Sequence, residues 1–542
     1  MMLKDWVVTK RVGAVVASPV RGAWLYLPAA LLALAMSLPL IYLIIRASTA
    51  GSSAWNWLLR VQTVQIMGQS VGLALSVMLA ALILGVLLAW LVTRSDLIGR
   101  TIWSALLPLP LVIPSYVGAY LFVSFFAPRG LLQNLLEGWL GIEQLPSIYG
   151  FWGAWLVLTL MTYPYVFLAA RTVLMRGDRS LEEAARSLGC SPLETFWKVT
   201  LPQLRPALAA SSLLVGLYVL RDFGAVSILR FTTFTRAIYL QYQSSIDRSA
   251  AALLSLVLIL ITVGFLVTEQ RFRRSAAENP YTAVRPVDLV PLGRWQILAL
   301  SAVILTVVFG LILPTAVLFY WLVRGLAAGE QLGIWVSPLV GSVSVSGLAA
   351  ILTILAALPV AILSVRRKNL LTKVLEKWSY LGYAVPGIVV ALALVFLGAN
   401  FVPQLYQTFF MLLFAYTILF LPQAMGSIQA ALRMVQRSLE EAAASLGENP
   451  LGVFQRVTLP LMMPGVATAA ALVFLTTMKE LPATLLLAPT GFSTLATQVW
   501  GAVSEAYFAR AAAPALILIL TSSISMYLIN HHSAIEGSSQ RQ

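Results

Sequence analysis

Long apolar segments recur along the whole chain, and this recurrence limits its fold more than any other feature. A helix of about 20 apolar residues spans the hydrocarbon core of a bilayer. Apolar residues form 59% of the sequence and charged residues 11%, whereas soluble domains average about 25% charged residues. The sequence therefore excludes a soluble globular protein and a disulfide scaffold, and it predicts an all-α polytopic membrane protein with about 12 transmembrane helices. The predicted spans are 24–46, 68–93, 103–127, 149–170, 206–229, 250–268, 295–323, 340–364, 378–399, 405–432, 463–487 and 509–530.

Basic residues are unevenly distributed between the two sides of the predicted membrane. If the N-terminus is cytoplasmic, 26 of the 36 Lys and Arg residues lie on inside segments, eight lie outside and two lie within spans. Because cytoplasmic segments carry an excess of Lys and Arg, we expect both termini in the cytoplasm. The first span lacks a clear cleavage site, so we expect a retained helix there and not a signal peptide. The net charge of +15 then requires no nucleic-acid partner.

Residues that would carry catalysis or hold a metal are scarce in this sequence. Cys190 is the only cysteine, His531 and His532 are the only histidines, and no metal-binding or P-loop spacing occurs. We therefore predict no catalytic residues, no metal site and no cofactor in this chain. If ATP drives the protein, another polypeptide must hydrolyse it.

The sequence contains an internal repeat. LEEAARSLGCSPLETFWKVTLP at 181–202 returns as LEEAAASLGENPLGVFQRVTLP at 439–460, with 15 of 22 positions identical. Six spans in each half is an even number, so the halves enter the membrane in the same orientation, with a pseudo-two-fold axis along its normal and a path between them. The predicted organisation is a first half at 1–270 (core 66–268), a cytoplasmic linker at 271–294 and a second half at 295–542 (core 337–530).

Each copy of the repeat is predicted to form a helix–turn–helix outside the bilayer, between the fourth and fifth spans. A Ser and a Glu three residues later predict a capping box at the start of the first helix, and a glycine predicts its end. A proline then starts a second helix, which we expect to end before the Leu-Pro pair. The residues are Ser180, Glu183, Gly189, Pro192 and Pro202 in one copy, and Ser438, Glu441, Gly447, Pro450 and Pro460 in the other. An amphipathic helix that lies on the membrane surface remains an alternative. Two copies with the same spacing, however, favour a partner with two equivalent docking surfaces.

The spacing of these residues resembles the coupling-loop signature of binding-protein-dependent ABC importer permeases. Glu183-Ala184-Ala185, Gly189 and Leu201-Pro202 carry the resemblance in the first copy, and 441–443, 447 and 459–460 carry it in the second. It implies the type I ABC importer permease fold and two copies of a separate ABC ATPase subunit that bind ATP-Mg. The residues implied to couple to the ATPases are Glu182, Glu183, Ala184, Ala185, Gly189, Glu440, Glu441, Ala442, Ala443 and Gly447.

The segments 221–242 and 479–500, after each loop, look like those of fused permeases of ferric-iron importers. This resemblance implies a periplasmic iron(III)-binding protein as partner and a bacterial inner-membrane location. Thiamine, phosphonate, sulfate and polyamine remain alternative substrates, because related permeases handle them. The residues themselves do not indicate iron. Tyr163, Tyr165 and Tyr239 lie near predicted span ends, where an aromatic belt is the favoured interpretation.

Four charges, Arg221, Asp222, Lys479 and Glu480, occupy equivalent positions near the ends of the two fifth spans. A charge at the bilayer centre costs about 2.5–3.5 kcal/mol on insertion scales, so these side chains must pair, face water or reach the interface. They are candidates for a pathway wall or a gate, and a structural ion pair remains open. An ion-coupled secondary transporter, with the two acids as proton carriers, is the rival class, and a membrane scaffold is a third. The two coupling loops favour the importer.

Overall fold

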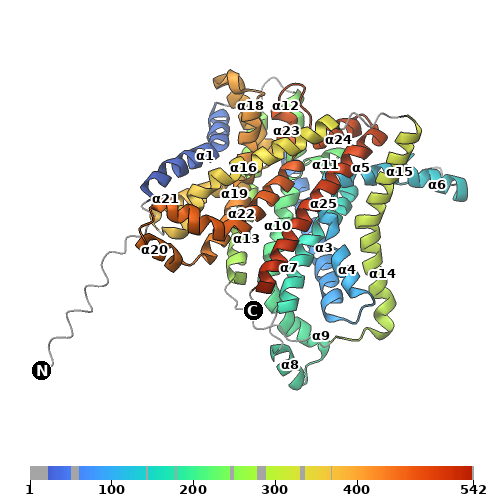
Figure 1. The fold of residues 1–542 in the computed structure, drawn as a ribbon. Helices are drawn as coiled ribbons and strands as arrows, with labels where there is room; N and C mark the ends of the chain where they lie inside the picture. Colours follow the sequence, from blue (N-terminus) through green and yellow to red (C-terminus); the bar gives the residue numbers. More distant parts are fainter. Residues whose placement is uncertain are drawn as a thin grey trace.

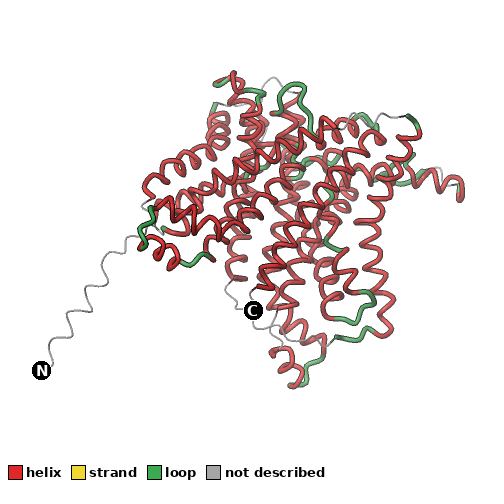
Figure 2. Tube along the Cα trace, in the orientation of Figure 1, coloured by secondary structure: helices red, strands yellow, loops and turns green. Residues whose placement is uncertain are grey.

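The computed structural model describes residues 22–49, 60–141, 144–176, 180–244, 249–277, 289–329, 336–367 and 369–539. Within these ranges the chain is helical, apart from turns, loops and one isolated bridge between Ser95 and Val290 (Figures 1 and 2). The predicted all-α architecture is therefore confirmed. Of the predicted linker, residues 278–288 lie outside the described residues, and the domain boundaries stay a prediction.

The helices of the first half run from the N-terminal segment to residue 277. They are η1 (Gly22–Leu25), α1 (Tyr26–Ser48), α3 (Val61–Arg94), α4 (Arg100–Leu106), η2 (Leu109–Val112), α5 (Ser115–Phe126), α6 (Leu131–Leu140), α7 (Phe151–Arg176), α8 (Ser180–Ser187), α9 (Pro192–Thr195), η3 (Phe196–Thr200), α10 (Leu201–Arg221), α11 (Gly224–Ile228), α12 (Phe234–Ser244) and α13 (Ser249–Ala277).

The helices of the second half follow in the corresponding order. They are η4 (Gly293–Trp295), α14 (Gln296–Val307), η5 (Val308–Ile312), α15 (Leu313–Ala327), α16 (Val336–Arg366), α17 (Leu370–Ser379), η7 (Tyr380–Tyr383), α18 (Gly387–Phe401), η8 (Pro403–Leu405), α19 (Phe409–Met434), α20 (Arg437–Ser445), α21 (Pro450–Val453), η9 (Phe454–Thr458), α22 (Leu459–Met478), α23 (Pro482–Leu487), α24 (Leu495–Ser504) and α25 (Phe508–Ser539). Among the described residues, only the first half has a helix like α6 between its third and fourth spans, and this insertion changes the offset between the repeats.

The two halves pack their long helices in the same way. In the first half α3, α7 and α10 contact one another and α10 contacts α13, while α16, α19, α22 and α25 repeat this arrangement in the second half. Small residues bring the helices close together, because a Cβ added at Gly85 of α3 would lie 2.8 Å from the Val166 Cβ of α7. The duplicated sequence thus forms a duplicated helical core.

The first long helix of each half also contacts the other half. Helix α1 packs against α13 of its own half and against α16, α17 and α18 of the second half, and α15 packs against α25 and against α5 of the first half. The stacked rings of Tyr42 and Phe396, with centroids 4.7 Å apart, belong to the first of these contacts. The peripheral helices therefore hold the two halves together.

Nine helices of the described residues are long and apolar enough to cross a membrane. Two further pairs qualify only as bent spans, Arg100–Val112 with Ser115–Gly138 at 97° and Leu370–Tyr383 with Gly387–Phe401 at 102°. The apolar part of α25, Phe508–Ser523, lies at the twelfth predicted position. The expectation of continuous helices at 103–127 and 378–399 is wrong, because Pro114 and Pro386 adopt extended backbone where the chain turns. A proline lacks the N–H that would continue a helix.

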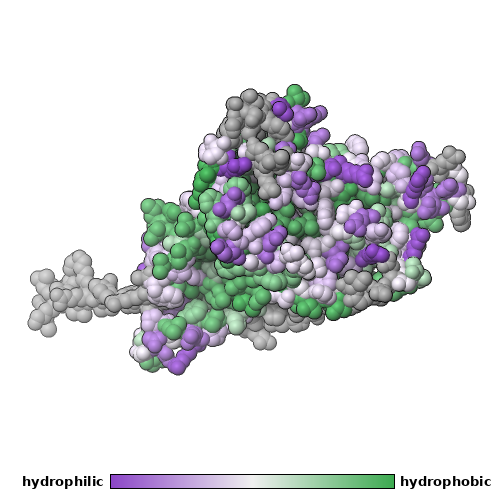
Figure 3. Space-filling view, turned by 90° about the horizontal axis from the view of Figure 1, so that it is seen from above, coloured by the Kyte–Doolittle hydropathy of each residue, from purple (hydrophilic) through white to green (hydrophobic). Residues whose placement is uncertain are grey.

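The fifth spans also end earlier than predicted. Helix α10 ends at Arg221 and α22 at Met478, although the apolar segments predicted 206–229 and 463–487. The short helices α11 and α23 follow each break. Seen from the side of α12, α18 and α24, hydrophilic residues spread over the face and hydrophobic residues gather along one flank (Figure 3). The breaks place Asp222, Lys479 and Glu480 between helices, and Arg221 at the last residue of α10.

Candidate coupling loops and the interface between the halves

The two repeated loops form short helices at the lower edge of the view in Figure 1, with α8 on one side and α20 on the other. Both end as predicted, at glycines with left-handed backbone, Gly189 at φ 88° and Gly447 at φ 91°. The residue after each glycine closes the turn, since Cys190 N donates to Ala185 O at 3.1 Å and Glu448 N donates to Ala443 O at 3.2 Å. This is the glycine-terminated helix end in which a side chain at the glycine would be strained.

The predicted capping boxes at the start of these helices are not found where the structure describes them. Helix α20 starts at Arg437 after Gln436, which makes no side-chain cap. In the first copy, residues 177–179 before α8 lie outside the described residues. A capping box occurs instead at the second turn, where Ser191 and Glu194 bond to each other's backbone N–H. The bond from the Ser191 backbone N–H lowers the pKa of the Glu194 carboxyl.

The second helix of each loop continues into the membrane, so the expectation that it ends before Pro202 and Pro460 is wrong. One π-helical turn, Phe196–Thr200 or Phe454–Thr458, precedes each Leu-Pro pair. Leu201 N donates to Phe196 O, five residues back. This wider turn lets the helix pass a proline, whose ring would clash with the carbonyl four residues back in a regular α-helix.

One acid anchors each loop to the bundle. In the first half the two Glu182 carboxylate oxygens lie 3.3 and 3.4 Å from the guanidinium nitrogens of Arg94, the last residue of α3. Thr200 also donates to Glu182, at 2.8 Å. Because Glu182 turns inward, its carboxylate acts as an anchor and the exposed neighbour Glu183 is left at the surface.

The second half repeats the same arrangement. Arg366, the last residue of α16, donates to Glu440 at 2.8 Å, and Thr458 donates to the same carboxylate at 2.9 Å. Glu440 is 5% exposed. Sequence reasoning missed the two arginines and the two threonines. Arg94 and Arg366 precede Pro114 and Pro386 by the same spacing, and that signal could have found them.

The outer face of each loop carries exposed apolar side chains. Leu188 and Leu446 precede the terminal glycines and are 86% and 87% exposed. Leu181, Leu439 and Leu451 are also exposed. Apolar side chains left exposed at equivalent positions mark an interaction surface more than scattered single residues do.

The four intramembrane charges lie at the helix breaks. Asp222 accepts hydrogen bonds from Ser115, from Ala225 N at 3.0 Å and from Val226 N at 3.3 Å. Glu480 accepts a hydrogen bond from Ala483 N at 3.2 Å. Each acid therefore accepts from backbone N–H groups in the first turn of the short helix that follows it, α11 or α23, which have no helical partner.

The two bases reach across the interface between the halves. Arg221 donates to the Tyr383 carbonyl at 3.5 Å, and Lys479 donates to the Leu111 carbonyl at 3.3 Å. The two bases thus join the halves at two equivalent places, and the role of the four charges as a pathway wall or gate stays a prediction.

Tyrosines surround these charges. Tyr165 and Tyr218 have ring centroids 6.2 Å apart, Tyr116 follows Ser115 at the start of α5, and Tyr383 belongs to η7. The expected aromatic belt is wrong for Tyr163, which is fully buried and donates to Leu107 O at 2.6 Å. We define the break-point cluster as Tyr116, Tyr165, Tyr218, Arg221, Asp222, Tyr383, Lys479 and Glu480.

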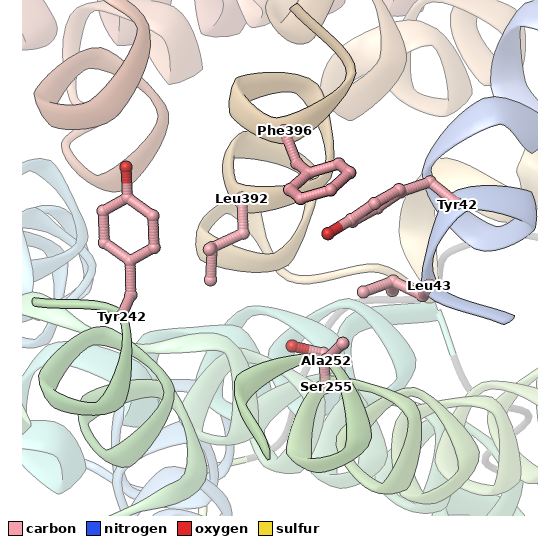
Figure 4. Close-up of a pocket in the computed structure, with 7 residues that line it drawn as sticks. All are labelled: Tyr42, Leu43, Tyr242, Ala252, Ser255, Leu392 and Phe396. Carbon is pink, nitrogen blue, oxygen red and sulfur yellow. The ribbon is translucent and has the colours of Figure 1, made fainter. Parts of the chain in front are cut away.

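Other candidate sites are few. The described residues contain no group of three or more His, Cys, Asp or Glu side chains placed to hold a metal ion. A small cavity lies between α1, α12, α13 and α18 and is lined by Tyr42, Leu43, Tyr242, Ala252, Ser255, Leu392 and Phe396 (Figure 4). None of the break-point cluster lines this cavity.

A duplicated helical core, with equivalent surface loops and a polar interface between parallel halves, defines a membrane transport permease. Residues 81–274 and 349–534 match the family described as binding-protein-dependent transport system inner membrane component. The chain belongs to this family, so it is the multi-pass inner-membrane permease component of an ABC importer and not an enzyme.

Individual relatives cover different shares of the chain. The Fe(3+)-transport system permease protein FbpB 2 of Haemophilus influenzae is 36% identical over 94% of this chain and 98% of its own length. The ferric transport system permease protein FbpB of Actinobacillus pleuropneumoniae is 26% identical over 76% of this chain and 63% of its own length. The molybdenum transport system permease protein ModB of Escherichia coli is 31% identical over 33% of this chain.

Proposed function

We propose that this permease passes ferric iron from a periplasmic iron(III)-binding protein to the cytoplasm. The observation that supports ferric iron as the substrate is the similarity to a ferric permease over 94% of this chain and 98% of that relative. The match to a molybdenum permease covers only 33% of the chain. Iron is therefore favoured over the other substrates of related permeases.

We propose further that two copies of an ABC ATPase subunit dock on α8 and α20 from the cytoplasm. Two features support this proposal. The Arg–Glu–Thr contacts fix both helices against the bundle, and the exposed Leu188 and Leu446 give each loop the same apolar contact surface. A rigid attachment is what a loop needs if movement of a partner is to be transmitted to the spans.

The test is transport by the reconstituted complex. Proteoliposomes that contain the permease, its ATPase subunits and its binding protein should accumulate radiolabelled iron when ATP is supplied. Collapse of the proton gradient at constant ATP should leave uptake unchanged, whereas omission of the ATPase subunits should abolish it. Uptake that follows the proton gradient would support a secondary transporter, and uptake of molybdate or thiamine without iron would replace the substrate.

A further inference from the structure

The last part of the linker pairs with the end of α3. Val290 N donates to Arg94 O at 2.9 Å, and Asp96 N donates to Val290 O at 3.2 Å. These two bonds form the isolated parallel bridge between Ser95 and Val290. The Asp96 carboxylate accepts a third bond, from Leu292 N at 2.8 Å. Three hydrogen bonds thus tie the start of the second half to the end of a first-half helix.

The pairing satisfies carbonyl groups at the C-terminus of α3. The last carbonyl groups of a helix have no partner within it. Ser95 Oγ donates to Leu91 O at 2.6 Å, and Val290 supplies the N–H for the carbonyl of Arg94. The side chain of the same arginine holds Glu182 of the first repeated loop. Arg94 therefore contacts the linker through its backbone and the loop through its side chain.

The second half satisfies the equivalent carbonyl from its own loop. Arg366 ends α16 and holds Glu440 by its side chain. The carbonyl of Arg366 accepts a bond from the guanidinium of Arg437, the first residue of α20, at 3.1 Å. Arg179, the counterpart of Arg437 in the repeat, lies outside the described residues. In the described contacts, the second anchor is held by its own loop and the first anchor is held by the linker.

The first anchor also depends more on where the backbone places its arginine. The guanidinium nitrogens of Arg94 lie 3.3 and 3.4 Å from the Glu182 oxygens, whereas Arg366 lies 2.8 Å from Glu440. Hydrogen bonds between an arginine and a carboxylate are normally about 2.7–2.9 Å long and weaken as they lengthen. A further shift of the Arg94 backbone would therefore release the first loop more easily than an equal shift would release the second.

We propose that residues 289–292 of the linker position the first repeated loop, and that Asp96 is the positioning residue through which they act on the contact between Arg94 and Glu182. This inference rests on the proposed docking of an ATPase subunit on α8. The linker leads directly into η4 and α14, so the tie joins the first loop to both halves. The second anchor is held within the second half, and the two docking sites are therefore not equivalent.

The experiment measures thiol labelling in the complete complex of permease, ATPase subunits and binding protein, with the label read on the separated permease. Cys190 is the only cysteine of the chain, and it follows the glycine that ends α8. It reports on the first loop. Glu448→Cys in a Cys190→Ser background reports on the equivalent place in the second loop. Asp96→Ala removes the acceptor for Leu292 N, and Asp96→Asn keeps a carbonyl oxygen in its place.

The expected effect is confined to one loop. Loss of one hydrogen bond shifts a local equilibrium by about threefold to tenfold. Asp96→Ala should speed the labelling of Cys190 by this factor and leave the labelling of Glu448→Cys unchanged, and Asp96→Asn should restore the wild-type rate. ATP hydrolysis stimulated by the binding protein should fall in Asp96→Ala and recover in Asp96→Asn.

A second variant removes the same hydrogen bond from the donor side. Leu292 has φ −79°, a value that proline can adopt, and proline has no N–H to donate. Leu292→Pro should therefore speed the labelling of Cys190 as Asp96→Ala does. The double variant should add nothing further, because both changes remove one interaction. Additive effects of the two changes would overturn the role of this bond.

The other outcomes separate the two proposals. The positioning role is overturned by unchanged labelling of Cys190 in Asp96→Ala, by an equal rise at both reporters, or by Asp96→Asn behaving like Asp96→Ala. The docking is tested in wild type, where added ATPase subunits should slow the labelling of Cys190. If they do not, docking on α8 is refuted, while the effect of Asp96→Ala on Cys190 in the full-length permease still decides whether the linker positions the loop.

Discussion

Lys479 of the second half donates a hydrogen bond to the carbonyl oxygen of Leu111 in the first half, with the two atoms 3.3 Å apart. Arg221 makes the reciprocal bond to Tyr383. Both carbonyls lie three residues before the proline at which the bent span turns. A broken helix leaves carbonyl oxygens without helical partners, and such groups must be satisfied within the protein in a bilayer. The bases and the helix breaks are therefore two parts of one arrangement.

The first prediction concerns this contact. Lys479→Met removes the donor and leaves a carbonyl unsatisfied, which costs about 1–3 kcal/mol. We expect a lower thermal unfolding temperature for the detergent-solubilised permease. Lys479→Arg is the control, because arginine is the residue at the equivalent position of the first half, and it should stay close to wild type. Equal stability of Lys479→Met and wild type would show that the bond contributes nothing.

The second prediction separates two adjacent acids in the second loop. Glu440→Ala leaves Arg366 without its buried partner, a change that typically costs about 3–5 kcal/mol when one member of such a pair is removed. We expect α20 to become sensitive to limited proteolysis and the ATPase subunits to copurify poorly. Glu441→Ala, at the exposed neighbour, should leave proteolysis unchanged. Similar protease sensitivity of the two variants would contradict the anchoring role of Glu440.

The third prediction tests transmission through the loops. Gly447 has φ 91°, a value that proline cannot adopt because its ring fixes φ near −65°. Gly447→Pro should therefore distort the end of α20 while the spans still insert. Iron uptake and the ATP hydrolysis stimulated by the binding protein should fall together, as they should in Gly189→Pro. If the Gly189→Pro, Gly447→Pro double variant still couples ATP hydrolysis to iron uptake normally, the loops only lie on the membrane surface and do not transmit the ATPase cycle.

The fourth prediction fixes the orientation in the membrane. Asn134 lies on α6 and Lys373 lies on α17, and both are exposed. A cysteine at Asn134 should react with a membrane-impermeant thiol reagent added outside intact cells, and one at Lys373 only after the membrane is opened. Gly333, which lies outside the described residues, should behave like Asn134. The reverse pattern would place the termini and the coupling loops on the periplasmic side.

The sequence by itself determined the features that depend on local chemistry and on repetition. Apolar segments long enough to span a bilayer predicted the helices, and the repeat predicted two equivalent halves. Gly189 and Gly447 predicted the ends of α8 and α20, since a left-handed backbone favours glycine wherever it occurs. Pro450 predicted the start of α21, and the side chain of Asn449 before it accepts a bond from Gly452 N at 2.7 Å.

Tertiary structure alone decided how the polar groups are paired. Hydropathy cannot distinguish a straight span from a bent one, because the residues around Pro114 and Pro386 are apolar in both cases. Glu182 and Glu183 are chemically identical neighbours, and only the position of Arg94 turns one inward as an anchor. Lys479 and Leu111 are far apart in the sequence, and they meet because a broken helix of one half ends beside a bent span of the other half. Spacing along a chain carries no information about that distance, which the packing of the whole bundle sets.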